Sequence, residues 1–157
     1  MNIIEGDLFA LVKENDGGNV IIHGCNCMGA FAAGVAGLVR NNYPRAYEDY
    51  AHAHKEGTLI PGSVHYSFID EDIIINAMTQ YYPGAHAKLE HIEACFNKII
   101  VCLKLIAERG LIKYDNIWLP AIGCGIGGLV FDQVYPLFEK LNVLEEYGYT
   151  VNLVLYK

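Results

Sequence analysis

Residues 20–44 read VIIHGCNCMGAFAAGVAGLVRNNYP, and this stretch decides the fold. Three apolar residues, Val20–Ile22, predict a buried strand that runs directly into polar and small residues at His23–Asn26. In residues 29–37, eight of nine are Gly, Ala or Val. The apolar residues that follow predict a helix that stops at Pro44. The pattern is therefore a strand, a loop of small residues and a helix.

This arrangement suits an anion. Small residues let a ligand approach the backbone, while the start of a helix offers unpaired N–H groups and a positive dipole end. The alternative is that the glycines and alanines only permit close packing of a helix on a sheet. The spacing matches neither the dinucleotide motif G-x-G-x-x-G nor the P-loop motif G-x-x-x-x-G-K-[ST].

A second glycine-rich loop follows another short buried strand. Asn116–Pro120 predicts that strand, and residues 121–128 read AIGCGIGG before a helix that starts near Asp132. Two strand, loop and helix sites in one domain are more specific than one. They are what a diphosphate needs when it lies between two backbone loops.

Composition limits the classes of protein. The chain has 157 residues, of which 53% are hydrophobic and 18% charged, which fits one folded domain. A net charge of −7 argues against general nucleic-acid binding, because phosphate backbones are held by clustered Lys and Arg. No apolar run approaches a bilayer span, and the first ten residues do not resemble a signal peptide. We therefore expect a cytoplasmic protein that does not bind membranes, and a monomer.

The five cysteines are expected to be reduced thiols, because an odd number stands in a chain without a secretory signal. His23, Cys25 and Cys27 alternate along the chain and raise a zinc hypothesis. No second pair with metal-site spacing follows them, so we expect neither a metal nor a cofactor.

The remaining segments predict the architecture. Short strands are expected at Asn2–Glu5 and Thr150–Tyr156, and a turn is expected at Asp16–Asn19. A tight hairpin joins Val64–Ile69 to Ile73–Ala77, so the sheet is mixed. Pro44–Glu56 and Ala87–Arg109 predict helices, the second ending at Gly110. These elements predict an α/β fold: a single three-layer α/β/α domain over residues 1–157 with a central mixed β-sheet.

The motifs resemble those of macro domains, the ADP-ribose-binding modules. Gly6-Asp7 after the first strand, Asn26 with the small-residue loop, and Leu119–Gly128 resemble three separate family motifs. Within the family, His23–Cys27 and the downstream Tyr43-Pro44 are most similar to the ADP-ribose 1''-phosphate phosphatase branch. Read without the resemblance, Gly6-Asp7 is only a turn with a helix N-cap.

The resemblance implies a set of site residues. Asp7 would receive the adenine amino group, Asn26 would meet the distal ribose, and His23 would take part in catalysis together with Asn26. The implied ligand-binding residues are Gly6, Asp7, Leu8, Cys25, Asn26, Gly34, Val35, Ala36, Gly123, Cys124, Gly125, Ile126 and Gly127.

The chain also departs from the family. Ala32-Ala33-Gly34 stands where a glycine triplet is usual, and Gly127 replaces an aromatic residue that many members place beside the distal ribose. Another branch cleaves glutamate-linked ADP-ribose with a Lys and an Asp. Its Asp would stand at Gly127, and its Lys is missing from Thr79–Tyr81.

Three functions are expected to compete. The first is hydrolysis of ADP-ribose 1''-phosphate to ADP-ribose and phosphate, with the His23 imidazole as acid or base. The second is a non-catalytic ADP-ribose reader in which His23 only orders the strand end. The third is hydrolysis of protein-linked or O-acetyl ADP-ribose by a water activated on the ligand itself.

Overall fold

The structure is a computed structural model that describes residues 1–15, 17–110 and 113–156. A six-stranded sheet forms its centre, in the order β1-β6-β5-β2-β4-β3. The strands are β1 (Asn2–Glu5), β2 (Asn19–Cys25), β3 (Val64–Ile69), β4 (Asp72–Met78), β5 (Asn116–Pro120) and β6 (Thr150–Leu155). All neighbours are parallel except β3, which pairs antiparallel with β4. The mixed sheet is as predicted.

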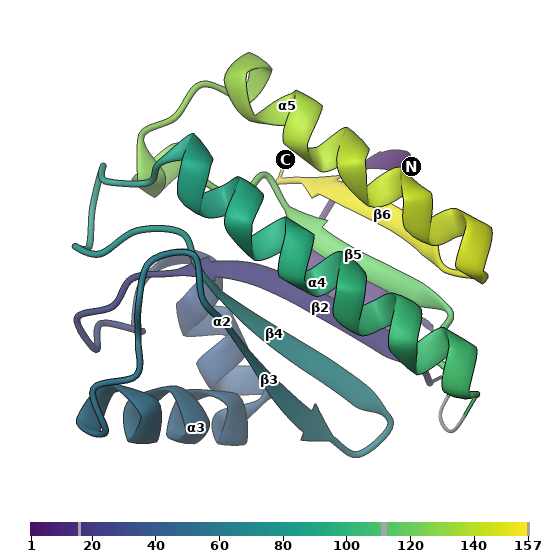
Figure 1. Ribbon diagram of the computed structural model, residues 1–157, viewed down its shortest axis with the longest axis horizontal. Coiled ribbons are helices and arrows are strands. Elements are labelled where there is room, and N and C mark those ends of the chain that lie inside the picture. The colour runs from purple at the N-terminus through teal and green to yellow at the C-terminus, as the bar shows by residue number, and fades with distance from the viewer. Residues whose placement is uncertain (16, 111–112, 157) are drawn as a thin grey trace.

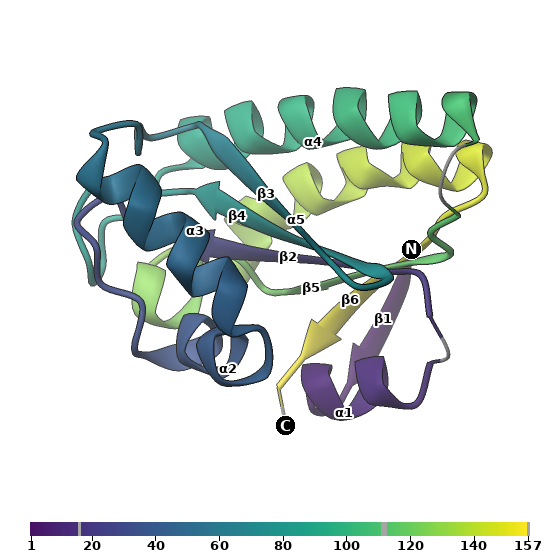
Figure 2. The ribbon, with the colours of Figure 1, turned by 90° about the horizontal axis from the view of Figure 1, so that it is seen from below.

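Helices cover both faces of this sheet (Figures 1 and 2). Each face has its own core, one beneath the first three helices and one beneath the last two helices and the 3-10 segment η2. The helices are α1 (Leu8–Lys13), α2 (Gly34–Asn42), α3 (Pro44–Lys55), α4 (Leu89–Arg109) and α5 (Phe131–Glu139), with 3-10 segments η1 (Gly125–Gly127) and η2 (Lys140–Tyr147). The predicted three-layer α/β/α fold is confirmed.

Strand β2 lies between β5 and β4, with helices over both of its faces, and this explains its apolar sequence. Val20 and Ile22 point into the core under α4, whereas Ile21 points into the core under α1 to α3. All three side chains are fully buried. A central parallel strand is expected to be apolar on both faces for this reason.

The predicted elements are present, with small shifts at their ends. β2 continues to Cys25, and α4 begins at Leu89 rather than Ala87. Gly110 caps α4 in the left-handed conformation at φ 61°. An N-cap was expected at Asp7, but neither helix α1 nor the 3-10 segment η2 was predicted. The expected turn at Asp16–Asn19 includes Asp16, which lies outside the described residues. None of the helices described is both long and apolar enough to cross a bilayer.

Candidate functional site

A cleft of about 520 Å³ opens where the parallel strands end. Segments that follow β1, β2, β4 and β5 line it, together with Val154 and Tyr156 at the end of β6. The carboxyl edge of such a sheet is where α/β proteins bind ligands. The cleft brings together nearly all the predicted site residues: Asp7, Leu8, Cys25, Asn26, Gly34, Val35, Ala36, Gly123, Cys124, Gly125, Ile126 and Gly127.

The first glycine loop ends at the start of α2. The first N–H groups of a helix have no partner within it, and the N-cap residue Ala33 supplies no side-chain hydrogen bond. Gly34, Val35 and Ala36 form this first turn and line the cleft. Unpaired N–H groups and the positive end of the helix dipole therefore face the space where a ligand would lie.

The second glycine loop lies across the cleft, between β5 and α5. Gly123 and Gly125 have φ values of 84° and 63°, which other residues rarely adopt. The cap residue of η1, Cys124, contributes no side-chain hydrogen bond to the N–H groups that follow it. Within the described chain the N–H groups of Cys124 and Gly127 bond to carbonyls of the loop, whereas those of Gly125 and Ile126 do not. Both loops therefore offer backbone donors at one cleft.

The two loops come into contact at Ile126. A Cβ at Gly34 would lie 3.1 Å from Cδ1 of Ile126, and the side chain of Ile126 is largely exposed. Gly34 also has φ 58°, so both backbone conformation and space favour glycine there. The cleft is narrow between these two residues.

Asn26 organises the loop that follows β2. Its Oδ1 accepts hydrogen bonds from the N–H groups of Met28 and Ala30, and its Nδ2 donates to the carbonyl of Ala30 at 2.7 Å. Buried Tyr50 donates from its hydroxyl to the Asn26 carbonyl at 2.8 Å and accepts from Gly29 N–H at 3.1 Å. Since an amide nitrogen carries two hydrogens, one N–H of Asn26 remains for a ligand.

Asp7 lines the cleft after the edge strand β1, on the side away from Asn26, and it caps α1. Its Oδ1 accepts hydrogen bonds from the N–H groups of Phe9 at 3.0 Å and Ala10 at 3.2 Å. This is the N-cap expected from the sequence. The carboxylate has a second oxygen for other donors, and it is exposed beside the cleft. Gly6 does not line the cleft; its N–H bonds instead to the carbonyl of Leu155.

His23 lies in the core of the protein rather than at the cleft. The ring is 0% exposed and does not line the cleft. It packs edge-on against Phe31 with 5.3 Å between ring centroids. The expectation that it stands at the strand end facing the loops is wrong, because β2 continues for two more residues and the alternation of the strand turns His23 into the core under α1 to α3.

Burial also sets the charge of this histidine. Desolvation lowers the pKa of His23 to about 4, while its hydrogen bond to Asn76 opposes the shift. The imidazole is therefore neutral at pH 7. Its Nδ1 lies 3.7 Å from Sγ of Cys25, which does line the cleft. Burial raises the pKa of Cys25, so this group is a thiol rather than a thiolate.

The segment after β4 contributes residues that the sequence analysis did not assign to the site. Thr79, Gln80, Pro83 and Gly84 line the cleft. The sequence marked Thr79–Ala87 as a loop where ligands could bind, but it gave no reason to select single residues. Eleven further residues complete the lining and were also not predicted as site residues: Phe9, Gly24, Ala30, Ala32, Ala33, Leu38, Pro120, Ala121, Ile122, Val154 and Tyr156.

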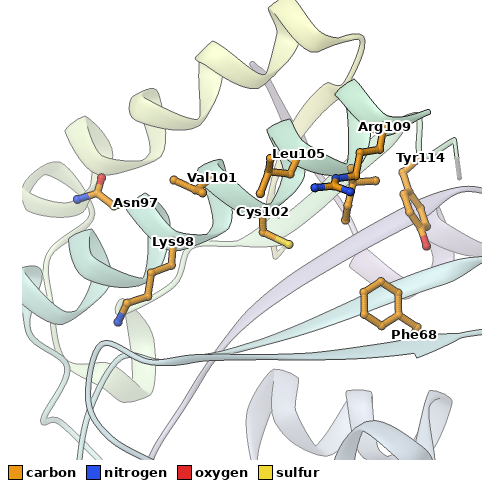
Figure 3. A pocket seen from close by; sticks show the side chains of 9 residues that line it. Phe68, Asn97, Lys98, Val101, Cys102, Leu105, Arg109 and Tyr114 are labelled. Atoms are coloured by element: carbon orange, nitrogen blue, oxygen red, sulfur yellow. The ribbon is translucent and has the colours of Figure 1, made fainter. Parts of the chain in front are cut away.

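A second cavity, of about 700 Å³, lies between α4 and strand β3 (Figure 3). Phe68, Val101 and Leu105 form its apolar surface, with Lys98 and Arg109 at its ends. Lys98 already donates to the carbonyl of Gly62. This groove lacks the loop N–H groups of the first cleft. In the part of the chain that the structure describes, no three His, Cys, Asp or Glu residues are grouped to hold a metal ion.

Comparison with known sequences identifies the family. Residues 22–138 match the family described as the Macro domain, so the chain belongs to the macro domain family. It is 31% identical over 147 residues to an uncharacterised 17.5 kDa protein of Enterobacteria phage T4, covering 88% of each chain. It is also 22% identical over 155 residues to the ADP-ribose 1''-phosphate phosphatase of Lodderomyces elongisporus, covering 95% of this chain and 97% of that one.

Solved structures agree on the fold. The macrodomain of Thermus aquaticus DarG superposes with a TM-score of 0.75 at 23% identity, covering 99% of this chain and 97% of that one. Thermosipho africanus DarTG in complex with ADP-ribose gives a TM-score of 0.75 at 20% identity, covering 98% of this chain and 41% of that one. At these identities the likeness extends to the fold alone.

Proposed function

We propose that this chain binds ADP-ribose in the cleft, with the diphosphate between the two glycine loops. The observation that carries the proposal is the meeting of unpaired backbone donors from Gly34–Ala36 and from the Gly125 loop across one cleft. None of the described residues that line the cleft is Lys, Arg or His. A diphosphate would therefore be held by N–H groups and the end of a helix dipole.

The adenine would lie at the Asp7 end. Leu8 and Val154 supply apolar surface there, and the second oxygen of Asp7 can accept a hydrogen bond from the adenine amino group. The distal ribose would lie toward Asn26, whose remaining amide N–H can donate to a ribose oxygen. The complex of Thermosipho africanus DarTG with ADP-ribose supports the choice of ligand.

The second candidate function is hydrolysis of ADP-ribose 1''-phosphate. The name of the Lodderomyces elongisporus relative, which is similar over nearly its full length, favours it. The buried His23 cannot touch a ligand in this conformation, so a contribution from it would pass through the Cys25 thiol or require the ring to be uncovered. This geometry favours the reader over the phosphatase.

Calorimetric titration with ADP-ribose tests the binding proposal. Saturable one-to-one binding is expected, with ribose 5-phosphate as a ligand control that lacks the adenine and the diphosphate. No heat from ADP-ribose, together with a normal thermal unfolding transition, would reject the proposal.

A time course of phosphate release from ADP-ribose 1''-phosphate tests the second function. General acid or base catalysis by one side chain contributes about 10²–10⁴ in rate, so loss of that size in His23→Ala, with ADP-ribose affinity within about threefold, would assign His23 a role in chemistry. Full activity in the variant would make His23 structural. Binding without phosphate release by the wild type would leave the reader, and release of acetate or of protein-bound ADP-ribose would support the third function.

A further inference from the structure

The side chain of Gln80 is held in one orientation at the wall of the cleft. Its Nε2 donates to the carbonyl oxygens of Tyr82 at 2.6 Å and Gly84 at 2.7 Å. Carbonyl oxygens only accept hydrogen bonds, so the atom that faces them must be the nitrogen. The other amide atom, Oε1, is then an acceptor in a side chain that is only 8% exposed.

Oε1 of Gln80 is turned toward Gly127. It would lie 3.5 Å from a Cβ at that position, and both residues line the cleft. A Cβ at Gly127 would lie 3.0 Å from Cβ of Ala87, so this position is tightly packed and a side chain there would crowd Oε1. Within residues 1–15, 17–110 and 113–156 no hydrogen bond reaches Oε1. An acceptor at the wall of the cleft that has no partner in the protein can take a hydrogen bond from a ligand.

Gln80 also lies opposite Asn26. The Thr79 N–H donates to the Cys25 carbonyl, and the Cys27 N–H donates to the Tyr81 carbonyl, so these two hydrogen bonds bracket Asn26 on one segment and Gln80 on the other. Asn26 offers one donor and Gln80 one acceptor. Sugar hydroxyl groups both donate and accept, so this pair matches a ribose edge.

Beyond the free N–H of Asn26, the loop that follows β2 offers no backbone donor in Cys27–Ala30 for an additional anion. All four N–H groups of Cys27–Ala30 are bonded inside the protein: to Tyr81 O, to Asn26 Oδ1 twice, and to the Tyr50 hydroxyl. A phosphate on the distal ribose would face the lone pairs of Gln80 Oε1 instead of a donor. Desolvating such an anion without hydrogen bonds is costly.

We propose that Gln80 is a specificity-determining residue that accepts a hydrogen bond from a hydroxyl of the distal ribose. This end of the cleft then selects ADP-ribose with an uncharged terminus over ADP-ribose phosphorylated there. The inference rests on the proposed binding of ADP-ribose and names the form of that ligand which the site prefers.

The wild type provides the first test, by titration with ADP-ribose, ADP-ribose 1''-phosphate and ADP. ADP-ribose is expected to bind at least about tenfold more tightly than its 1''-phosphate, because the added phosphate would lie beside an acceptor rather than a donor. Equal or tighter binding of the 1''-phosphate, or rapid release of its phosphate, would overturn the inference. If neither ADP nor ADP-ribose binds, the proposed function fails instead.

Variants of Gln80 provide the second test. Gln80→Leu removes the acceptor and should weaken ADP-ribose by about fivefold, the scale of one neutral hydrogen bond, while the affinity for ADP stays unchanged because ADP has no distal ribose. Gln80→Lys introduces a cation and should raise the affinity for the 1''-phosphate relative to ADP-ribose by about tenfold. A parallel loss for ADP and ADP-ribose in Gln80→Leu would mean that Gln80 only shapes the loop. Should a variant not fold, the wild-type comparison decides alone.

Discussion

Nε2 of His23 lies 2.5 Å from Oδ1 of Asn76, and this hydrogen bond links β2 to β4 inside the core. Asn76 donates from its Nδ2 to the carbonyl of Ala46, so its Oδ1 is the acceptor and His23 carries its proton on Nε2. Nδ1 is then a bare acceptor beside the Cys25 thiol. The histidine therefore connects the sheet to the cleft wall while remaining out of contact with solvent.

This burial predicts a loss of stability in mild acid. The pKa of His23 is about 4 in the folded protein, against 6.5 for a histidine that is not buried. Between pH 4 and 6.5 the unfolded chain therefore binds a proton at His23 more readily than the folded chain does. The stability that depends on neutral His23 is fully present above pH 6.5 and is lost as the pH falls toward 4. Between pH 7.5 and 5.0, His23 should lower the free energy of unfolding by about 2 kcal/mol. Urea unfolding of the wild type and His23→Gln at both pH values measures it.

The control for this prediction is His65→Gln. Burial also lowers the pKa of His65, but this ring is only half-buried, so its removal should change the pH dependence less. If His23→Gln loses as much stability in acid as the wild type, then His23 does not stay neutral in the folded state.

The fold could be predicted because its signals are local. The apolar run Val20–Ile22, the hairpin at Asp70 and the glycine cap at Gly110 each depend on residues close in sequence. Helix α1 was missed because it has only six residues, too few for an apolar stripe to repeat. The glycine loops could also be predicted from local sequence, because each one follows an apolar strand directly.

The positions of His23 and Gln80 could not be predicted from the sequence. Whether His23 faces the ligand depends on where β2 ends, and a shift of two residues moves the strand end past it. The orientation of the Gln80 side chain depends on backbone carbonyls within a Tyr, Pro and Gly loop, whose conformation has no periodic signal in the sequence. Local patterns in one sequence therefore locate strands and helices, but they do not fix which way the side chains at the ends of those elements point.

Asp7 separates a structural role from a binding role. Asp7→Asn keeps an oxygen for the α1 cap, so the free energy of unfolding should change by less than about 0.5 kcal/mol. The variant places an amide NH₂ where the second carboxylate oxygen would accept from adenine, so ADP-ribose affinity should fall by about 1–3 kcal/mol. Asp7→Ala should lose both the α1 cap and the adenine contact, and the lost cap should lower the free energy of unfolding by about 1 kcal/mol. Unchanged affinity in both variants, measured by calorimetry, would refute the adenine assignment.

Tyr50 is predicted to hold the loop that carries Asn26. Tyr50→Phe leaves the Gly29 N–H and the Asn26 carbonyl without their partner, which should cost about 1–3 kcal/mol of stability. ADP-ribose affinity should also fall, because the Asn26 amide is no longer fixed.

The matched control is Tyr47→Phe on the same helix. Tyr47 also packs its ring on Phe31, but within the described part of the chain its hydroxyl makes no hydrogen bond. Thermal unfolding and calorimetry on both variants measure the difference. Equal effects in the two would show that the hydroxyl of Tyr50 contributes nothing.

Gly125→Val is predicted to abolish ADP-ribose binding in a folded domain. Gly125 has φ 63°, and none of the described residues lies within 4 Å of a Cβ there. The side chain would therefore extend into the space beside the second loop, where the diphosphate is proposed to lie. Gly110 has φ 61° at the end of α4, away from the cleft, and a Cβ there would also have no described residue within 4 Å. Gly110→Val therefore carries a similar backbone strain, about 1–2 kcal/mol per residue in the left-handed region, without touching the ligand. Both variants should unfold at similar urea concentrations, and only Gly125→Val should lose binding in calorimetry. Normal binding by Gly125→Val would remove the second glycine loop from the site, and loss of binding in both would attribute the effect to the fold rather than to the loop.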